Sequence, residues 1–186
     1  KMSKRAGQFV TLRDVVDEVG RDPVRFMMIY RKSSEPLDFD FARVIEQSKD
    51  NPVFYVQYAH VRTLSILTNA QDNMKEAYNK YTQGDFDLSL LETEEEIQLI
   101  KLLASWPKSL ITAARHFEPH RIAYYLIDVA SRFHSIWNLG KENNDYRFTI
   151  QDNVELTAAR LALVEAIRKI LAEGFALIGV TPLEKM

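Results

Sequence analysis

Apolar residues recur at helical spacing along most of this chain, and prolines and glycines divide the pattern into segments. The sequence Asp50-Asn51-Pro52 combines a capping residue with a proline suited to the first helical position, and it predicts a helix to about Asn69. Signal for strands is weak outside residues 8–12. Because a period near 3.6 residues does not fit an alternating strand, the chain is predicted to be an all-α helical bundle.

The same signals predict the other helices. Thr11 is the expected N-cap of a first helix, Asp22 caps a second, and Pro107 kinks or divides a later one. The further helices are expected at residues 12–19, from 22 onward, 39–48, 74–81, 92–117, from 119 to just before 140, and from 152 to about 178.

Two helical faces are predicted in detail. On the helix from Pro52, the apolar stripe comprises Phe54, Tyr58, Val61 and Leu64. On the helix after the acidic residues 92–96, the buried face comprises Ile97, Ile100, Leu103 and Ala104. The acidic residues themselves are expected to form a solvated helix start, where negative charge opposes the helix dipole favourably.

The charge balance limits the function classes. A net charge of −2 and a pI of about 6.1 argue against strong, indiscriminate nucleic-acid binding. Acidic residues cluster between residues 82 and 100, which leaves the basic residues elsewhere compatible with a specific RNA-binding surface. The absence of cysteine excludes disulfides and thiolate metal sites and fits a reducing cytoplasm. No signal peptide or membrane-length apolar run is found, so no membrane association is expected.

Catalytic or metal-binding clusters are not evident. His116 and His120 have a spacing that can ligate a metal on one helical face, but Pro119 between them makes a shared regular helix unfavourable. No Ser-His-Asp arrangement is present, and no metal site is predicted.

The first residues form a basic loop. Lys1, Ser3 and Lys4 precede Gly7, and their ammonium and hydroxyl groups can contact phosphate oxygens. The alternative is an ordinary basic chain end, because motifs this short occur by chance.

Several stretches resemble one family. They are Lys1-Met2-Ser3-Lys4-Arg5, which is similar to the KMSKS loop of class I aminoacyl-tRNA synthetases, then Asn51-Pro52-Val53-Phe54-Tyr55-Val56-Gln57-Tyr58-Ala59-His60-Val61-Arg62, Thr157-Ala158-Ala159-Arg160-Leu161, and the final Glu184-Lys185-Met186. Together they resemble bacterial arginyl-tRNA synthetases over nearly the whole chain, although residues 68–93 match no stretch in detail.

The resemblance implies a division of the chain and a reaction. Residues 1–50 would end a catalytic domain and residues 51–186 would form an α-helical anticodon-binding domain. The intact enzyme would use ATP and Mg²⁺ to join arginine to tRNA(Arg). Lys1, Met2, Ser3 and Lys4 would form the ATP loop, with Lys1 and Lys4 as catalytic residues. Arg5 replaces the family's serine, which changes the hydrogen bonding at that position.

This chain begins with Lys1 inside that motif, so we expect it to be a fragment without the full active site and without a bound cofactor of its own. A cytoplasmic monomer is expected.

The resemblance also implies an anticodon pocket. Unstacked RNA bases require aromatic faces together with arginine or amide groups. The residues that fit best are Tyr55, Tyr58, Arg62, Trp137, Asn138 and Met186. Further candidates are His60, Arg121, Tyr124, Tyr125, Arg132, His134, Tyr146, Arg147 and Phe148.

Two alternatives stay open at this point. The neutral-to-acidic charge also fits a helical protein-interaction module without RNA binding. The helical pattern fits the anticodon domain of another class I synthetase, such as the cysteinyl or methionyl enzyme, although the Asn51 to Arg62 stretch argues against it.

Overall fold

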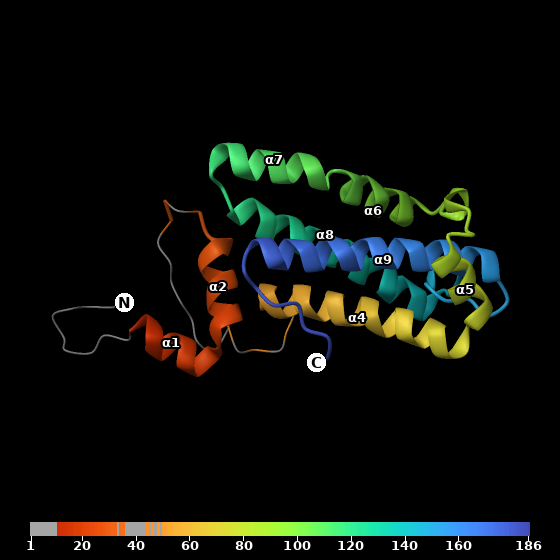
Figure 1. Cartoon of the computed structure of the whole chain (residues 1–186), viewed down its shortest axis with the longest axis horizontal. Coiled ribbons are helices and arrows are strands. Elements are labelled where there is room, and N and C mark those ends of the chain that lie inside the picture. Colours follow the sequence, from red (N-terminus) through yellow and green to blue (C-terminus); the bar gives the residue numbers. More distant parts are fainter. Residues whose placement is uncertain (1–10, 33, 36–43, 45, 47, 49) are drawn as a thin grey trace.

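A computed structural model describes residues 11–32, 34–35, 44, 46, 48 and 50–186 (Figure 1). Over these residues the regular structure is helical throughout, which confirms the predicted fold class. The helices are α1 (Leu12–Val19), α2 (Arg21–Tyr30), α4 (Pro52–Asn73), α5 (Lys75–Gln83), α6 (Glu94–Ala104), α7 (Trp106–His116), α8 (His120–Glu142) and α9 (Val154–Leu177), with short 3₁₀ turns η1 (Leu88–Leu90) and η2 (Asn144–Tyr146). The basic loop of residues 1–5, the extended signal before Thr11 and the predicted helix at 39–48 lie wholly or largely outside the described residues.

The three longest helices, α4, α8 and α9, run side by side along the long axis (Figure 1). Helices α6 and α7 continue one another along a second layer that packs on α8, while α5 packs across α4 and α9 at one end. At the opposite end, α2 stands across the bundle and contacts α8. None of the described helices is long and apolar enough to cross a membrane.

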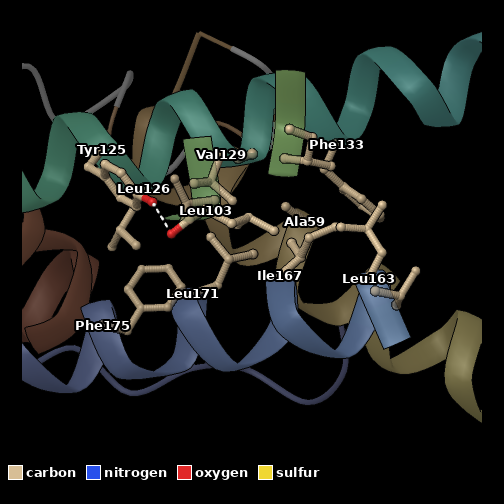
Figure 2. Close-up of a cluster of buried hydrophobic side chains, with 14 of the residues drawn as sticks. Ala59, Leu103, Tyr125, Leu126, Val129, Phe133, Leu163, Ile167, Leu171 and Phe175 are labelled. Atoms are coloured by element: carbon tan, nitrogen blue, oxygen red, sulfur yellow. Dashed lines mark hydrogen bonds between the residues drawn. The ribbon is translucent and has the colours of Figure 1, made fainter. Parts of the chain in front are cut away.

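The core lies where these helices meet. Figure 2 shows Val129 and Phe133 of α8 facing Ile167 and Leu171 of α9, with Ala59 of α4 beside them. All five side chains are inaccessible to solvent. Burial of each large apolar side chain contributes about 1.5–3 kcal/mol, so this seam provides much of the driving force for assembly.

The N-terminal helices confirm one capping prediction and correct another. Thr11 caps α1 in a reciprocal arrangement with Asp14, as predicted. The prediction that Asp22 caps α2 is wrong, because α2 begins at Arg21 after Gly20. The Asp22 carboxylate instead accepts a hydrogen bond from the backbone N–H of Thr181 at 2.9 Å. A residue that looked like a local cap therefore ties α2 to the C-terminal segment.

The predicted apolar stripe of α4 is not its most buried face. Phe54, Tyr58, Val61 and Leu64 are only partly buried. The buried residues of this helix are Val53, Val56, Gln57, Ala59, His60, Thr63, Ile66 and Ala70. The core side, which packs on α9, combines valine and isoleucine with small and polar residues, and the aromatic stripe stays partly accessible.

Pro107 divides α6 from α7 as predicted, but the predicted face of α6 is partly wrong. Ile100 and Ala104 are exposed. The predicted solvated acidic start is correct for Glu92 and Glu94, which are exposed, but wrong for Glu96, whose side chain is 3% exposed and pairs with Arg160 of α9 at 2.7 Å. The buried face of α6 therefore comprises Glu96, Leu99 and Leu103, with the Glu96 charge paired by Arg160.

The end of α8 differs from the prediction as well. The helix continues through Gly140 to Glu142 instead of stopping before Gly140. A Cβ at Gly140 would lie 3.1 Å from the carbonyl oxygen of Tyr146 and 3.3 Å from the Cα of Arg147. This glycine therefore allows a close approach of the following backbone.

Candidate nucleic-acid interface

The most distinctive surface feature is an arginine held between two aromatic rings. The guanidinium carbon of Arg62 lies 4.5 Å from the ring centre of Tyr58 and 4.3 Å from that of Trp137. Tyr58 and Arg62 are one turn apart on α4, and Trp137 reaches them from the end of α8. No salt bridge joins Arg62 to a carboxylate in the part of the chain that the structure describes. The two rings, not an acid, hold this cation in place.

A buried histidine packs against two of the aromatic rings. His134 lies 4.6 Å from the ring centre of Tyr55 and 5.4 Å from that of Tyr58. Its Nε2–H donates to the carbonyl oxygen of Tyr55 at 3.3 Å. Burial lowers the pKa of His134, the Tyr55 carbonyl raises it, and the nearby charges of Arg62 and Lys141 lower it further. The ring is therefore neutral at pH 7 and does not repel Arg62.

A cavity of about 400 Å³ opens beside the stack. Arg62 and Trp137 form one side, and Ile66 of α4 and Phe148 of the segment after η2 add apolar walls. The indole Nε1–H of Trp137 is buried and has no hydrogen-bond partner among the described residues. A buried donor without a partner costs free energy.

The segment that closes this cavity is held by a network reaching the core. Arg160 donates from Nε to Glu96 and from Nη1 to the carbonyl oxygen of Arg147, both at 2.7 Å. Arg147 in turn donates from Nε to the carbonyl oxygen of Gly140 at 3.0 Å. Glu96 also accepts hydrogen bonds from Thr93. The buried ion pair thus fixes the backbone that carries Arg147 and Phe148.

The C-terminal segment lies along the other end of α4 (Figure 1). Gln57 donates to the carbonyl oxygen of Thr181 at 2.9 Å and accepts from the N–H of Leu183 at 2.8 Å. The Nδ1–H of His60 donates to the carbonyl oxygen of Leu183 at 2.8 Å. Met186 is 55% exposed and lines a separate cavity of about 310 Å³ together with Phe54.

The structure brings together most of the residues predicted for this site. Tyr55, Tyr58, Arg62 and Trp137 form one cluster around His134. Asn138 follows Trp137 but is exposed, and its Oδ1 accepts from Lys141 at 3.0 Å.

Met186 is linked to the cluster through Phe54, whose ring stacks 6.1 Å from Tyr58. Two of the further candidates lie outside this cluster. Tyr125 belongs to the core and donates to the carbonyl oxygen of Leu102 at 2.7 Å, while Arg121 pairs with Glu118 near the start of α8.

Three contributors were not predicted from the sequence to be site residues. Phe54 stacks on Tyr58, and Ser65 and Asn69 line the cavity. All three lie on α4: Phe54 is four residues before Tyr58, Ser65 three residues after Arg62, and Asn69 four residues after Ser65. This polar and aromatic periodicity, read as a surface instead of a core stripe, would have found them.

The predicted ATP-loop residues Lys1, Met2, Ser3 and Lys4 lie outside the described residues. His116 ends α7 and His120 begins α8, so the two do not share a helix, as predicted. Within the described ranges, no group of three or more histidine or acidic side chains could hold a metal ion.

Fold and surface together define an all-α domain that presents a cation–aromatic stack beside a cavity large enough for a flat heterocycle. The family model for the DALR anticodon binding domain matches residues 56–186, and the chain belongs to this family.

Comparisons with individual proteins agree with the family. The chain is 61% identical over all 186 residues to proteins named arginine–tRNA ligase from Rickettsia bellii and Rickettsia felis. It spans 32% of the length of these relatives. The resemblance to arginyl-tRNA synthetases is thereby confirmed.

Solved structures show the same fold. A Thermus thermophilus arginyl-tRNA synthetase is similar over 98% of this chain and 29% of its own, with a TM-score of 0.68 and 26% identity. A putative arginyl-tRNA synthetase from Campylobacter jejuni, at 24% identity, shares the fold with a TM-score of 0.78 over 99% of this chain and 37% of its own.

Proposed function

We propose that this chain is the anticodon-binding part of an arginine–tRNA ligase that joins arginine to tRNA(Arg) with ATP. The observation that carries the proposal is the placement of Arg62 between Tyr58 and Trp137 beside the cavity of about 400 Å³. In this proposal residues 51–186 bind the anticodon loop, and residues 1–50 connect that domain to the catalytic part.

The geometry fits recognition of an unpaired base. Single-stranded loops are read by stacking their bases on aromatic or guanidinium planes and by hydrogen bonds to their edges. The rings of Tyr58 and Trp137 offer aromatic planes, and the guanidinium of Arg62 offers donors to a base edge or a phosphate. Because no carboxylate among the described residues neutralises Arg62, its charge remains available to RNA.

The remaining predicted residues take supporting roles in this proposal. Tyr55 and Tyr58 hold the position of the stack through His134. Asn138, exposed at the end of α8, contacts the backbone or a base edge of the loop. Met186 provides an apolar contact at the opposite end of the surface, beside Phe54.

The catalytic part of the proposal rests on the family relationship. Lys1, Met2, Ser3 and Lys4 would hold the phosphates of ATP, with Lys1 and Lys4 neutralising charge, and Mg²⁺ would bind in the catalytic part of the longer protein. ATP supplies the activation of the arginine carboxylate. The proposed enzyme acts as a monomer in the cytoplasm, where its tRNA substrate is found.

The test is binding of the chain to a tRNA(Arg) transcript and to the same transcript with its middle anticodon base changed, at one fixed salt concentration. We expect tighter binding of the unchanged transcript, because discrimination of one base edge is worth about 1–3 kcal/mol. The Arg62→Ala variant should lose this preference. The matched control is Arg115→Ala, which removes an exposed arginine from α7.

The outcomes separate the open alternatives. Equal binding to both transcripts would reduce the role of the chain to phosphate contact, since counter-ion release does not depend on sequence. Absence of binding to either would favour the helical protein-interaction module. Preference for the tRNA of another amino acid would favour another class I synthetase.

A further inference from the structure

The turn between α7 and α8 carries the most exposed large apolar side chain among the described residues. Phe117 is 90% exposed, and its ring makes no aromatic contact within the part of the chain that the structure describes. Its backbone adopts the left-handed conformation, with φ 55° and ψ 41°. Among the described residues other than glycine, it alone has a positive φ. The backbone N–H groups of Phe117 and Glu118 close the end of α7 on the carbonyl oxygens of Ala114 and Ala113.

Both properties of Phe117 cost stability in the domain by itself. The left-handed conformation crowds a side chain against its own backbone, so helix ends of this kind favour glycine or asparagine. An exposed phenylalanine also forgoes the free energy that burial of its ring would provide. Either favoured residue would form the same helix end, and phenylalanine adds only a projecting ring. Because local strain of this kind gathers at functional sites, the ring is a candidate contact with another molecule.

Basic side chains flank this ring. Arg115 and His116 directly precede Phe117 and are exposed, and neither forms a salt bridge in the described part of the chain. Glu118, which follows the ring, is already paired with Arg121. Charges across an interface are arranged to be complementary. A fitting partner therefore offers an apolar pocket bordered by carboxylates.

The turn lies at the end of the bundle where the N-terminal helices stand. Figure 1 shows α1, α2 and the turn between α7 and α8 at this end, and α2 packs against α8. The ring of Tyr30 on α2 meets that of Tyr124 on α8 edge-on at 5.0 Å, and Tyr124 also contacts His120, the first residue of α8. Under the proposed function, residues 1–50 lead from this end to the catalytic part. Because the chain spans 32% of the length of its relatives, that part is large enough to cover the turn.

An unpaired RNA base fits this turn less well than a protein surface does. From Trp137 back to His120, α8 extends about 26 Å at 1.5 Å per residue. At that distance from its anticodon loop, a tRNA has entered its base-paired stem. Paired bases do not offer their faces to an aromatic ring, whereas the unpaired bases of loops do.

We infer that Phe117 inserts into an apolar pocket on the catalytic part of the same ligase, where carboxylates around the pocket face Arg115 and His116. The inference rests on the proposed function and deepens it, because it fixes how the anticodon-binding domain is oriented on the part that performs the chemistry. The ring is a contact between domains and takes no part in base recognition.

The test uses a thiol reporter beside the ring. The chain contains no cysteine, so His116→Cys introduces a single thiol. Its rate of reaction with a soluble aromatic disulfide is measured in the chain alone and in the intact ligase, with every other cysteine of the ligase replaced by serine. We expect the reporter to react at least about tenfold more slowly in the intact ligase, because thiol reactivity depends on access. Ser135→Cys is the matched control, an exposed position on α8 away from the turn, and its rate should be the same in both proteins.

Phe117→Asn, combined with the reporter, tests the ring itself. Asparagine tolerates the left-handed conformation but lacks the ring, so the reporter in the intact ligase should regain most of its reactivity. In the chain alone, the same substitution should leave the urea midpoint of unfolding unchanged or raise it, since strain falls and no described ring contact is lost. A lower midpoint would overturn the inference, because the ring would then stabilise the domain's own fold.

The other outcomes are equally distinct. Equal reporter rates in the chain and in the ligase overturn the inference, and so does protection that persists after Phe117→Asn. Protection in the chain alone on addition of tRNA would make the turn an RNA contact, and protection that grows with the concentration of the chain would make it a contact between copies. Both results also overturn the inference.

Failure of the proposed function is recognised separately, by the transcript-binding experiment. If the chain prefers the unchanged transcript while the reporter is unprotected in the ligase, only the docking of Phe117 is overturned. If the chain shows no such preference, the proposed function fails whatever the reporter shows.

Discussion

Two arginines in this domain illustrate opposite uses of the same side chain. Arg160 is 3% exposed and pairs with Glu96 at 2.7 Å in the core. Arg62 lies half-buried at the surface between the rings of Tyr58 and Trp137, with no described carboxylate beside it. A buried guanidinium needs an acid and full hydrogen bonding, whereas a ring-held one keeps its charge for another molecule.

The two sites are also connected. Arg160 holds the carbonyl oxygen of Arg147, and Arg147 lines the cavity that Arg62 borders. Arg160 therefore fixes the backbone at one wall of the cavity that Arg62 borders. Substitutions at the first should affect stability and binding together, and substitutions at the second should affect binding alone.

The largest expected effect is on stability, from Arg160→Met. Removal of one partner leaves the Glu96 carboxylate buried without its cation, which typically costs about 3–5 kcal/mol. The free energy of unfolding, measured with urea, should fall by that amount. RNA affinity should fall too, because the Arg147 carbonyl loses its donor.

The double variant Glu96→Leu, Arg160→Met distinguishes the cost of an unpaired buried charge from the cost of lost packing. Replacement of both partners by apolar groups of similar volume is often close to neutral, so much of the lost stability should return. RNA affinity should not return fully, since no donor reaches Arg147. If the single and double variants are equally unstable, burial of an uncompensated charge is not the cause.

The next effect is expected from Gly140→Ala, which acts on the same wall without touching either arginine. The new Cβ would press on the backbone of Tyr146 and Arg147. Overpacking costs about 1–3 kcal/mol, and the better helix propensity of alanine offsets about 1 kcal/mol of that. Stability should therefore fall slightly, while RNA affinity falls more because the loop must move. At Gly84 no atom lies within 4 Å but φ is +76°, so Gly84→Ala should lower stability through backbone strain while leaving RNA affinity unchanged.

Arg62→Lys tests the ring-held arginine. Lysine keeps the charge but loses the planar group that stacks between two rings. We expect RNA binding to weaken by about 1–2 kcal/mol, and the free energy of unfolding to change by less than about 0.5 kcal/mol. Binding titrations and urea unfolding of the same protein preparation measure both. A large loss of stability would show that the stack of Arg62 with the two rings stabilises the fold and does not act mainly in RNA binding.

The same contrast explains what could be predicted from the sequence. Local signals were reliable: Thr11 caps α1, Asn51 caps α4, and Pro107 separates α6 from α7. Long-range pairings were not, because nothing near Glu96 in sequence indicates that Arg160 lies beside it. For the same reason Asp22 looked like a cap, although its partner Thr181 is far along the chain.

The site divides in the same way. Tyr55, Tyr58 and Arg62 lie within one stretch of α4, and the resemblance singled them out together with Trp137. The contribution of the segment around Arg147 depends on Gly140 and Arg160, which come from two other helices. Residues that act through tertiary contacts leave no periodic pattern in the sequence.

The smallest effect concerns pH and the histidines beneath the surface. Burial lowers the pKa of both His60 and His134 from an ordinary value near 6.5, although a backbone carbonyl partly opposes this at each site. The unfolded chain therefore takes up protons at higher pH than the folded one. The stability due to the neutral rings is fully present above pH 6.5 and is lost as the pH falls below it toward the lowered folded-state values.

The loss is at most about 1.4 kcal/mol per pH unit for each histidine, and urea unfolding between pH 7.5 and 5.5 measures it. His134→Gln should reduce the slope and also weaken RNA binding, since His134 supports Tyr55 and Tyr58. His60→Gln should reduce the slope while leaving the Arg62 stack in place, because His60 contacts the C-terminal segment instead. If both variants keep the original slope, the pH dependence arises from other groups, and the aromatic surface is not linked to histidine protonation.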